Sequence, residues 1–386
     1  MAKRPLNIAL IGYQFMGKAH SNAFRQVSRY FDLDVEPVMK VLVGRSEDKV
    51  RAMAEKYGWQ EYATRWEDVV SRPDIDLVDV ATNNNVHAEM AIAAAKAGKH
   101  VLCEKPLATS LADARRMLEA ARSAGIVHAI CHNYRKAPAV ALAKQLIDEG
   151  RIGRIYHWRG TYLQDWIADP SFPIVWRLDK SVAGSGSHGD LNAHLIDTAR
   201  WLVGEIGEVN GMLDTFVKQR PVLAESDDRL GGRAAEQMGD VTVDDSSIFL
   251  ARFDNGAVGT FEATRFAQGR KNFNRWEING SKGSVAFNLE RMNELEVYFA
   301  DDEPNVRGFR TVQATDSVHP YAGAYWPVAH IIGYEHTFIN LVKDLLEAIA
   351  AGKPASPDWL DGVRNQAVLE AVELSWASRH WEKPQA

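Results

Sequence analysis

The stretch Ile8–His20, IALIGYQFMGKAH, joins an apolar run to a glycine turn and to the start of a helical pattern. Dinucleotide-binding turns commonly read G-x-G-x-x-G between the first strand and the first helix of a βαβ unit. Gly12 and Gly17 stand at the first and last of these glycine positions, whereas Gln14 stands at the middle one. The stretch therefore predicts a strand, a turn and a helix, and it raises the question of whether a dinucleotide still binds there.

The three glycines of such a turn have different roles, and the middle one lets the backbone approach the pyrophosphate. The first glycine allows the tight bend and the last allows the helix to pack on the strand, while the phosphates are held mainly by backbone N–H groups and the helix dipole. A side chain at Gln14 is compatible with binding if it points away from the phosphates or donates its amide to them. A turn that merely connects a strand and a helix is the alternative interpretation.

Residues 1–130 alternate short apolar runs with helical patterns. The runs lie at residues 6–12, 38–44, 76–82, 100–106 and 126–135, and glycines that end helices follow at Gly58, Gly98 and Gly125. This alternation is typical of a parallel, doubly wound sheet, and nearly continuous Val, Ile, Leu and Ala is expected of strands covered on both faces. We expect an α/β protein whose N-terminal domain, residues 1–130, is a Rossmann dinucleotide-binding domain.

Residues 131–386 have a different rhythm. Strand-like runs lie at residues 154–163, 208–217, 246–253, 256–267, 275–281, 283–289 and 294–300, and two of the joints contain Asn-Gly, which favours hairpin turns. Two helices are expected within residues 333–352 and 359–381. We expect an α+β domain for substrate binding and oligomerisation, with a large open, mostly antiparallel sheet, helices on one face and a long surface loop over residues 220–245.

The composition excludes several classes of protein. The chain has 386 residues, 46% of them hydrophobic and 25% charged, and a net charge of -6, which gives no reason to expect a nucleic-acid partner. The N-terminus lacks a signal-peptide pattern, so we expect a cytoplasmic protein without a membrane partner. Cys103 and Cys131 are not spaced as a disulfide framework or a zinc site.

Two polar patterns point to chemistry. Lys105 follows an apolar run in HVLCEKPLA, at the sheet edge where open α/β sheets bind ligands, and an ammonium there can stabilise negative charge on a reacting oxygen. Asp190, His194 and Asp197 share one face of an amphipathic helix after GSGSHG, so a carboxylate could orient the histidine as a proton acceptor.

Simpler interpretations remain open for both patterns. Lys105 could be a strand-end lysine that reaches solvent. Asp190 could cap the helix, and His194 with Asp197 could be a surface pair. His188, Asp190 and His194 could hold a metal ion, but no further clustered ligands accompany them. We therefore expect no metal.

The segment VLVGRSED, residues 41–48, bears on the choice of cofactor. The second strand of such domains usually ends in an acid that binds the ribose of NAD or in a basic residue beside the extra phosphate of NADP. Here Gly44, Arg45 and Ser46 precede the first acid, Glu47. The pattern slightly favours NADP over NAD, although Arg45 could equally stack on adenine or be an ordinary surface residue.

Taken together, these stretches resemble the Gfo/Idh/MocA oxidoreductases, the glucose–fructose oxidoreductase and inositol dehydrogenase family, over essentially the whole chain. The resemblance is carried by residues 11–24, 79–108, 132–140, 148–155 and 184–205, and residues 160–166 and 176–190 are most similar to sugar and inositol dehydrogenases of this family. It implies oxidation of a secondary alcohol on a sugar or cyclitol by NAD or NADP. It also implies that His194 accepts the proton, that Lys105 and Asp190 assist, and that the Lys105–Pro106 bond is cis.

The resemblance also implies two sets of binding residues. The expected cofactor-binding residues are Gly12, Gln14, Phe15, Met16 and Gly17, with Arg45 at the adenosine end and Thr82, Asn84, His87, Glu104 and Lys105 nearer the nicotinamide. The expected sugar-binding residues are Tyr134, Arg135, Gln164, Asp165, Trp166, Arg177 and His188. Such a mixture of polar and aromatic groups suits a sugar. Gln14 and the missing acid near Gly44 depart from the family pattern.

Three functions are compatible with these observations. The first is an NAD(P)-dependent sugar or cyclitol dehydrogenase. The second is glycoside cleavage by oxidation and elimination, in which the cofactor is regenerated and an aglycone is released. The third is a non-catalytic nucleotide- or carbohydrate-binding protein, which would not need Lys105, Asp190 and His194 together. An open sheet face in the second domain leads us to expect a homodimer or homotetramer.

Overall fold

The computed structural model describes residues 3–226 and 231–386, which form two compact units. The first unit contains the chain up to Asn133 and the segment Tyr334–Gln366, and the second contains the other described residues. The continuous second domain expected from the sequence therefore differs from the second unit, because helix α9 (Tyr334–Ala351) belongs to the first. Phe338 of α9 packs there against His20, with ring centroids 5.5 Å apart.

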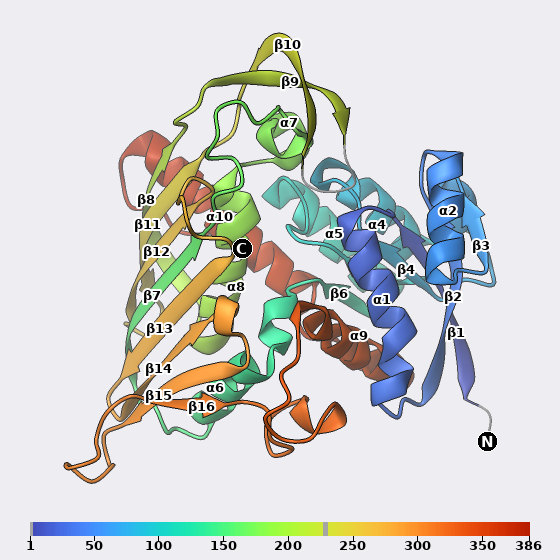
Figure 1. Cartoon of the computed structure of the whole chain (residues 1–386). Coiled ribbons are helices and arrows are strands. Elements are labelled where there is room, and N and C mark those ends of the chain that lie inside the picture. The colour runs from blue at the N-terminus through green and yellow to red at the C-terminus, as the bar shows by residue number, and fades with distance from the viewer. Residues whose placement is uncertain (1–2, 227–230) are drawn as a thin grey trace. The chain divides into compact units, whose positions relative to one another are not determined.

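The first unit contains the predicted parallel sheet. Its six strands run in the order β3-β2-β1-β4-β5-β6, and every pair is parallel (Figure 1). The strands are β1 (Arg4–Ile11), β2 (Val35–Val43), β3 (Glu61–Ala63), β4 (Leu77–Val80), β5 (His100–Cys103) and β6 (His128–Ile130). This is the strand order of dinucleotide-binding domains, so the Rossmann prediction is confirmed.

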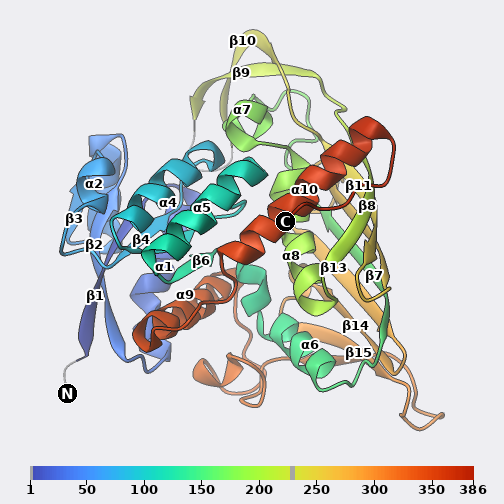
Figure 2. The same cartoon turned by 180° about the vertical axis from the view of Figure 1, so that it is seen from behind.

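Helices cover this sheet as the sequence predicts. They are α1 (Phe15–Tyr30), α2 (Glu47–Tyr57), α3 (Glu67–Val70), α4 (His87–Lys96) and α5 (Leu111–Ala124), and α4 and α5 lie side by side (Figure 2). Gly58, Gly98 and Gly125 adopt positive φ where α2, α4 and α5 end, which confirms the helix ends expected there.

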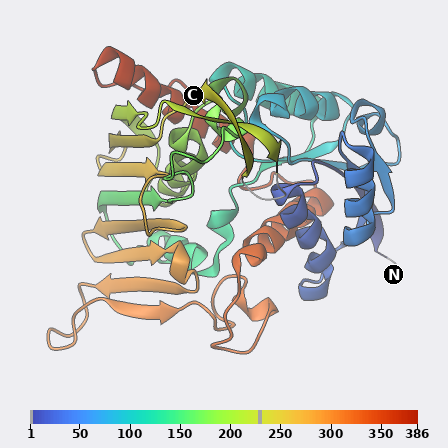
Figure 3. The same ribbon diagram turned by 45° about the horizontal axis from the view of Figure 1, so that its top comes forward.

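The second unit contains an eight-stranded, mostly antiparallel sheet, also as predicted. The strand order is β16-β15-β14-β13-β7-β12-β11-β8, and β7 with β12 is the parallel pair (Figure 3). The strands are β7 (Ile155–Leu163), β8 (Ile206–Asp214), β11 (Ser246–Phe253), β12 (Val258–Thr264), β13 (Phe273–Gly280), β14 (Gly283–Asn288), β15 (Glu294–Phe299) and β16 (Arg310–Gln313).

Helices pack on one face of this sheet. Helix α6 (Pro138–Asp148) contacts β14 and β15, and α8 (Ala193–Leu202) contacts β7. The C-terminal part of α10 (Trp359–Ser378) contacts β8, where Ser375 accepts a hydrogen bond from the Gly211 amide. The short helix α7 (Lys180–Ala183) precedes the glycine-rich segment of this unit.

The surface loop expected over residues 220–245 is wrong for most of its described length. Strands β9 (Gln219–Ser226) and β10 (Gly232–Asp240) form an antiparallel ribbon there, while residues 227–230 lie outside the described residues. The buried Arg220 guanidinium donates to the carbonyl oxygens of Ile167 and Asp169, at 2.5 and 2.7 Å. These tertiary contacts outweigh the polar composition on which the loop prediction rested.

Trp158 is the centre of the second sheet's core. It is fully buried and lies between Phe261 and Trp276, with ring centroids 5.7 and 5.8 Å away. Gly160 and Gly259 make room for the indole, because a Cβ atom at either position would lie 2.8 or 3.1 Å from it. The two glycines and Trp158 therefore have to be present together.

No helix in the described ranges, 3–226 and 231–386, is long and apolar enough to span a membrane.

Replacement of Trp158 by Ala should lower the free energy of unfolding of the second unit by about 3–5 kcal/mol, because a large cavity replaces a close-packed ring. Tyr156→Ala is the matched control on the same strand, and its half-exposed side chain should contribute only about 0.5 kcal/mol. Urea unfolding measures both values. Equal effects of the two substitutions would contradict this packing.

Candidate active site

The glycine turn after β1 packs closely against β4. Gly12 has φ +114, and a Cβ atom on it would lie 2.2 Å from the Ala81 carbonyl oxygen. A Cβ atom on Gly17 would lie 2.2 Å from the carbonyl oxygen of Gly12. Both positions therefore require glycine, one for the turn and one for the approach of α1.

Gln14 does not obstruct this turn. Its φ is -78, which any residue adopts, and its side chain is exposed and makes no capping hydrogen bond to the described start of α1. Phe15 begins the 16-residue helix and is 45% exposed. Gln14 therefore introduces no positive φ at the turn, and the N-terminus of α1 follows the glycine backbone directly.

Gly44 stands at the end of β2, where NAD-binding domains usually have an acidic residue. A Cβ atom on Gly44 would lie 2.1 Å from the Tyr13 ring, so a larger side chain at position 44 collides with that ring. Arg45 follows as an exposed residue. The departure from the acidic pattern is therefore linked to the packing of Tyr13 against the strand end.

Three of the residues expected near the nicotinamide lie beyond β4. The His87 ring is fully buried, with Nδ1 3.0 Å from the Pro106 carbonyl oxygen and Nε2 3.2 Å from that of Thr82. Burial lowers the pKa of His87. This ring supports the loop at Thr82 and the loop at Pro106, while Asn84 begins the short 3-10 helix Asn84–Val86.

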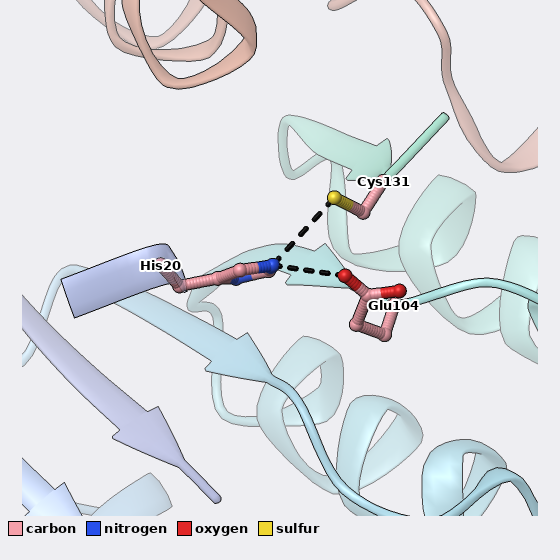
Figure 4. A group of neighbouring side chains, drawn as sticks. All are labelled: His20, Glu104 and Cys131. Carbon is pink, nitrogen blue, oxygen red and sulfur yellow. Dashed lines mark hydrogen bonds and ion pairs between the residues drawn. The ribbon is translucent and has the colours of Figure 1, made fainter. Parts of the chain in front are cut away.

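Glu104 and Lys105 follow β5 directly. The Lys105–Pro106 bond is cis, as the sequence analysis predicts. The Glu104 carboxylate is buried and accepts a hydrogen bond from the Lys105 amide at 2.9 Å. Its other oxygen lies 2.9 Å from Nε2 of His20 (Figure 4). Sequence reasoning placed Glu104 among the cofactor ligands and missed His20.

In the second unit, a buried carboxylate fixes the glycine-rich segment. Asp244 accepts hydrogen bonds from the amides of Gly186 and His188 and from the Ser187 hydroxyl, each at 2.7 Å. A Cβ atom on Gly186 would lie 1.8 Å from the Asp244 carbonyl oxygen. The segment continues as a π-helical turn, His188–Asn192, that contains Asp190 and leads into α8.

The His188 ring lies inside the second unit. It is fully buried, with Nδ1 2.9 Å from the Ser247 hydroxyl oxygen and Nε2 3.0 Å from the Leu369 carbonyl oxygen. Both ring nitrogens are thus within hydrogen-bond distance of groups inside the second unit. A sugar contact through this ring, which the sequence analysis expects, would require rearrangement.

The structure brings His194 together with aromatic residues. The ring is stacked on Tyr134, with centroids 4.4 Å apart, and the Tyr162 ring lies 5.9 Å away. The two tyrosine hydroxyl oxygens are 2.9 Å apart, and the Tyr162 hydroxyl donates to Asn272 at 2.7 Å. Gln164 also donates to Asn272, at 2.9 Å. The ring of His194 thus adjoins a fixed polar network that sequence reasoning identified only in part.

Trp166 and Arg265 connect Gln164 to Asp190 within the second unit. Trp166 donates its indole N–H to Gln164 at 2.9 Å. Arg265, which directly follows β12, is fully buried, lies over the Trp166 ring and has Nη1 3.7 Å from Oδ2 of Asp190. Sequence reasoning missed Arg265, although an arginine that ends an apolar strand is the same kind of signal as Lys105.

The remaining predicted sugar ligands form other contacts within the second unit. Arg135 makes a buried bidentate ion pair with Asp197, at 2.7 and 2.5 Å. Asp165 pairs with Lys271 at 2.7 Å, and Arg177 lies over the Trp176 ring at 4.3 Å. Asp197, which shares a helical face with His194 in the sequence pattern, is thus committed to Arg135.

Comparison with known proteins gives the family. A model described as an oxidoreductase family with an NAD-binding Rossmann fold matches residues 6–132, and a GFO/IDH/MocA C-terminal domain matches residues 140–286. The chain belongs to the GFO/IDH/MocA oxidoreductase family. The resemblance predicted from the sequence is confirmed, and the protein is an oxidoreductase with an NAD-binding domain.

Individual relatives narrow the comparison. A levoglucosan dehydrogenase from Pseudarthrobacter phenanthrenivorans is 46% identical over 380 residues, which cover 97% of each chain. A solved levoglucosan dehydrogenase in complex with NADH and levoglucosan is 45% identical, with a TM-score of 0.94 and coverage of 99% of this chain and 100% of that one. A myo-inositol 2-dehydrogenase from Thermotoga maritima is 28% identical, with coverage of 92% of each chain.

Substitutions in the glycine turn test whether Gly12 is needed for NAD binding and whether Gln14 hinders it. Gly12→Ala should raise the Kd for NAD at least about tenfold, because the new methyl group collides with the Ala81 carbonyl and displaces the phosphate-binding backbone. Gln14→Gly should change that Kd by less than about threefold, since the native φ already suits most residues. Titration calorimetry measures both constants. A large gain in affinity from Gln14→Gly would show that the native side chain hinders binding.

Proposed function

We propose that the protein oxidises a ring hydroxyl of levoglucosan or of a closely similar sugar and passes the hydride to NAD. The observation that carries this proposal is the 46% identity to a levoglucosan dehydrogenase over almost the full length of both chains. Sugar and cyclitol dehydrogenases are also the broader class to which the family relatives belong. The NADH in a 45% identical structure supports NAD as the cofactor, whereas the indication of NADP from Arg45 stays a prediction.

His194 is proposed as the proton acceptor. The hydroxyl proton of the sugar passes to the imidazole while the C–H bond breaks, which leaves a ketone, a reduced cofactor and a protonated histidine. NAD supplies hydride acceptance when it is bound. Stacking on Tyr134 and the neighbouring Tyr162 holds the imidazole plane in one orientation, which supports this role.

Lys105 and Asp190 are proposed to assist. The ammonium of Lys105 would hydrogen-bond a hydroxyl oxygen of the sugar and stabilise negative charge that develops on it. Asp190 would accept a hydrogen bond from the sugar or from His194, with the buried Arg265 guanidinium beside it. Gln164 and Trp166 offer polar and aromatic surface of the kind that sugars bind.

Lys105→Ala should lower kcat by about 10²–10⁴-fold, because the lost interaction is made to charge that develops in the transition state. The Kd for NAD should stay within about threefold. Lys96→Ala, which removes an exposed lysine from the last turn of α4, is the control and should leave kcat unchanged. Steady-state kinetics and cofactor titration separate the two effects. Unchanged turnover in Lys105→Ala would refute the proposed role.

A substrate screen tests the reaction itself. Levoglucosan, other sugars and inositols are offered with NAD and, separately, with NADP, and both nicotinamide absorbance and products are followed. We expect one ketone for each NADH with levoglucosan or a near relative of it. Release of an aglycone with no net NADH would instead support oxidation and elimination, and inactivity with every compound alongside tight sugar binding would support a non-catalytic protein.

The outer face of the second sheet supports the proposed homo-oligomer. Met212, Ile248, Leu250 and Val258 are each 40–49% exposed and lie on the neighbouring strands β8, β11 and β12. Exposed apolar side chains grouped on one sheet face are typical of an interface, and a second copy of the chain fits a flat, strand-built surface.

Leu250→Arg should convert the oligomer to a monomer, because a charge in an apolar interface is left unpaired. Val306→Arg is the control, since Val306 is 70% exposed and lies outside the strands. Light scattering coupled to size-exclusion chromatography measures the mass. A native protein that is already monomeric would contradict the prediction.

A further inference from the structure

We propose that His20 is a positioning residue: a buried imidazolium that holds the Glu104 carboxylate on the backbone amide of Lys105 and so orients the lysine for catalysis. This inference rests on the proposed role of Lys105. It gives a function to two residues that the reaction itself does not use, and all of its contacts lie within the first unit.

The imidazole is enclosed by carboxylates. His20 is 2% exposed, its Nδ1 lies 2.7 Å from Oδ2 of Asp79, and its Nε2 lies 2.9 Å from Oε1 of Glu104. Figure 4 shows Nε2 directed at the Glu104 carboxylate. A neutral imidazole has one N–H, whereas ionised carboxylates only accept hydrogen bonds. While both carboxylates are ionised, both contacts are hydrogen bonds at the same time only when both ring nitrogens carry protons.

The directions of the pKa shifts of His20 and Glu104 also favour a protonated imidazole. Burial alone would lower the pKa of His20, but the charge of Asp79 and the hydrogen bond to it raise this pKa well above its ordinary range. Burial raises the pKa of Asp79. Glu104 shows the opposite balance: burial would raise its pKa, but the hydrogen bond and charge of His20 lower it. The raised pKa of His20 and the lowered pKa of Glu104 both favour an imidazolium paired with an ionised Glu104.

The Glu104 carboxylate connects His20 to the backbone of Lys105. Oε1 faces His20, while Oε2 accepts the hydrogen bond from the Lys105 amide at 2.9 Å. The Glu104 amide donates to the Val80 carbonyl oxygen at 2.9 Å, so the backbone is fixed on both sides of this side chain. Loss of the imidazolium would leave an unpaired buried carboxylate, which would protonate or turn away from the amide.

Cys131 and Phe338 also lie beside the imidazole, and both are uncharged. The Sγ atom of Cys131 lies 3.6 Å from Nε2, and burial raises the pKa of that thiol, which is therefore neutral at ordinary pH. Phe338 of α9 contributes an uncharged ring. Burial likewise raises the pKa of Cys103, which is therefore neutral, and the Lys105 charge contributes to the lowered pKa of Glu104.

The same cluster contains donors for a metal ion, since ligand atoms of His20, Glu104 and Cys131 lie within 4.8 Å of one another. A metal would need a free lone pair on Nε2. That nitrogen is instead at hydrogen-bond distance from a carboxylate, and Nδ1 is engaged by Asp79, so both ring nitrogens are already used in hydrogen bonds.

The charge state of His20 is measured by nitrogen NMR of the ¹⁵N-histidine-labelled full chain. Both ring nitrogens should remain protonated well above pH 6.5, and Glu104→Gln should lower the pKa of the ring. Because the folded-state pKa lies above the unfolded value, the contribution of His20 to stability is complete below about pH 6.5 and is lost as pH rises through the folded-state pKa. A ring with one N–H at pH 7, or stoichiometric metal in the purified protein, would overturn the proposal.

The catalytic consequence is measured with His20→Asn and Glu104→Gln. Each should lower kcat about 10- to 100-fold while KM for the sugar changes little, and His20→Asn should also leave the Kd for NAD little changed, because the lysine is misplaced and not removed. Cys131→Ala, which leaves both carboxylate contacts intact, is the matched control and should retain kcat. Activity within twofold of the native value in both cluster variants would refute the proposal.

A double-variant cycle separates this inference from the proposed function. If His20 acts through Lys105, His20→Asn should cause no further loss of kcat in the Lys105→Ala background, whereas a general structural effect should add. Additive losses would refute the positioning role and leave the role of Lys105 intact. Full activity of Lys105→Ala would refute the proposed function itself.

Discussion

The close approach of Gly12 to the carbonyl of Ala81 is the constraint on which the first unit depends. Because no Cβ atom fits there, and none fits between Gly17 and the turn, α1 starts directly beside the ends of β1 and β4. The helix N-terminus is then available to phosphate groups. One turn further along, the same helix carries His20 to Asp79 of β4 and to Glu104 after β5. A single backbone contact thus organises both the cofactor turn and the support of Lys105.

In the second unit, the backbone of the glycine-rich segment is held by a buried carboxylate and not by a close glycine contact. Asp244 binds three donors of the glycine-rich segment and so fixes the π-helical turn that contains Asp190. In both units, a buried carboxylate holds the backbone beside a proposed catalytic side chain. Buried ionic hydrogen bonds are suited to this task because they are short and directional, and because an unpaired partner is costly.

Much of the fold could be predicted because it follows from local patterns. The parallel sheet follows from apolar runs alternating with helices, and helix ends follow from glycines such as Gly58 and Gly125. The β9–β10 ribbon could not be predicted, since its polar strands are held by Arg220 through distant carbonyl groups. Motif spacing identified Lys105, Asp190 and His194 as candidates, and their roles stay predictions. It could not find Asp244, Arg265 or the partner of Glu104, because these contacts join residues far apart in the chain.

The packing of Tyr13 against Gly44 has an evolutionary consequence. An acid at the end of β2 is the usual means of gripping the adenosine ribose, yet in this chain it would have to occupy the volume of an aromatic ring. The two positions are therefore coupled: an acid at position 44 requires that the Tyr13 ring move or be replaced by a smaller side chain. Descendants that acquire the acidic residue should carry a small side chain at position 13, and the two substitutions should appear together along the same lineages.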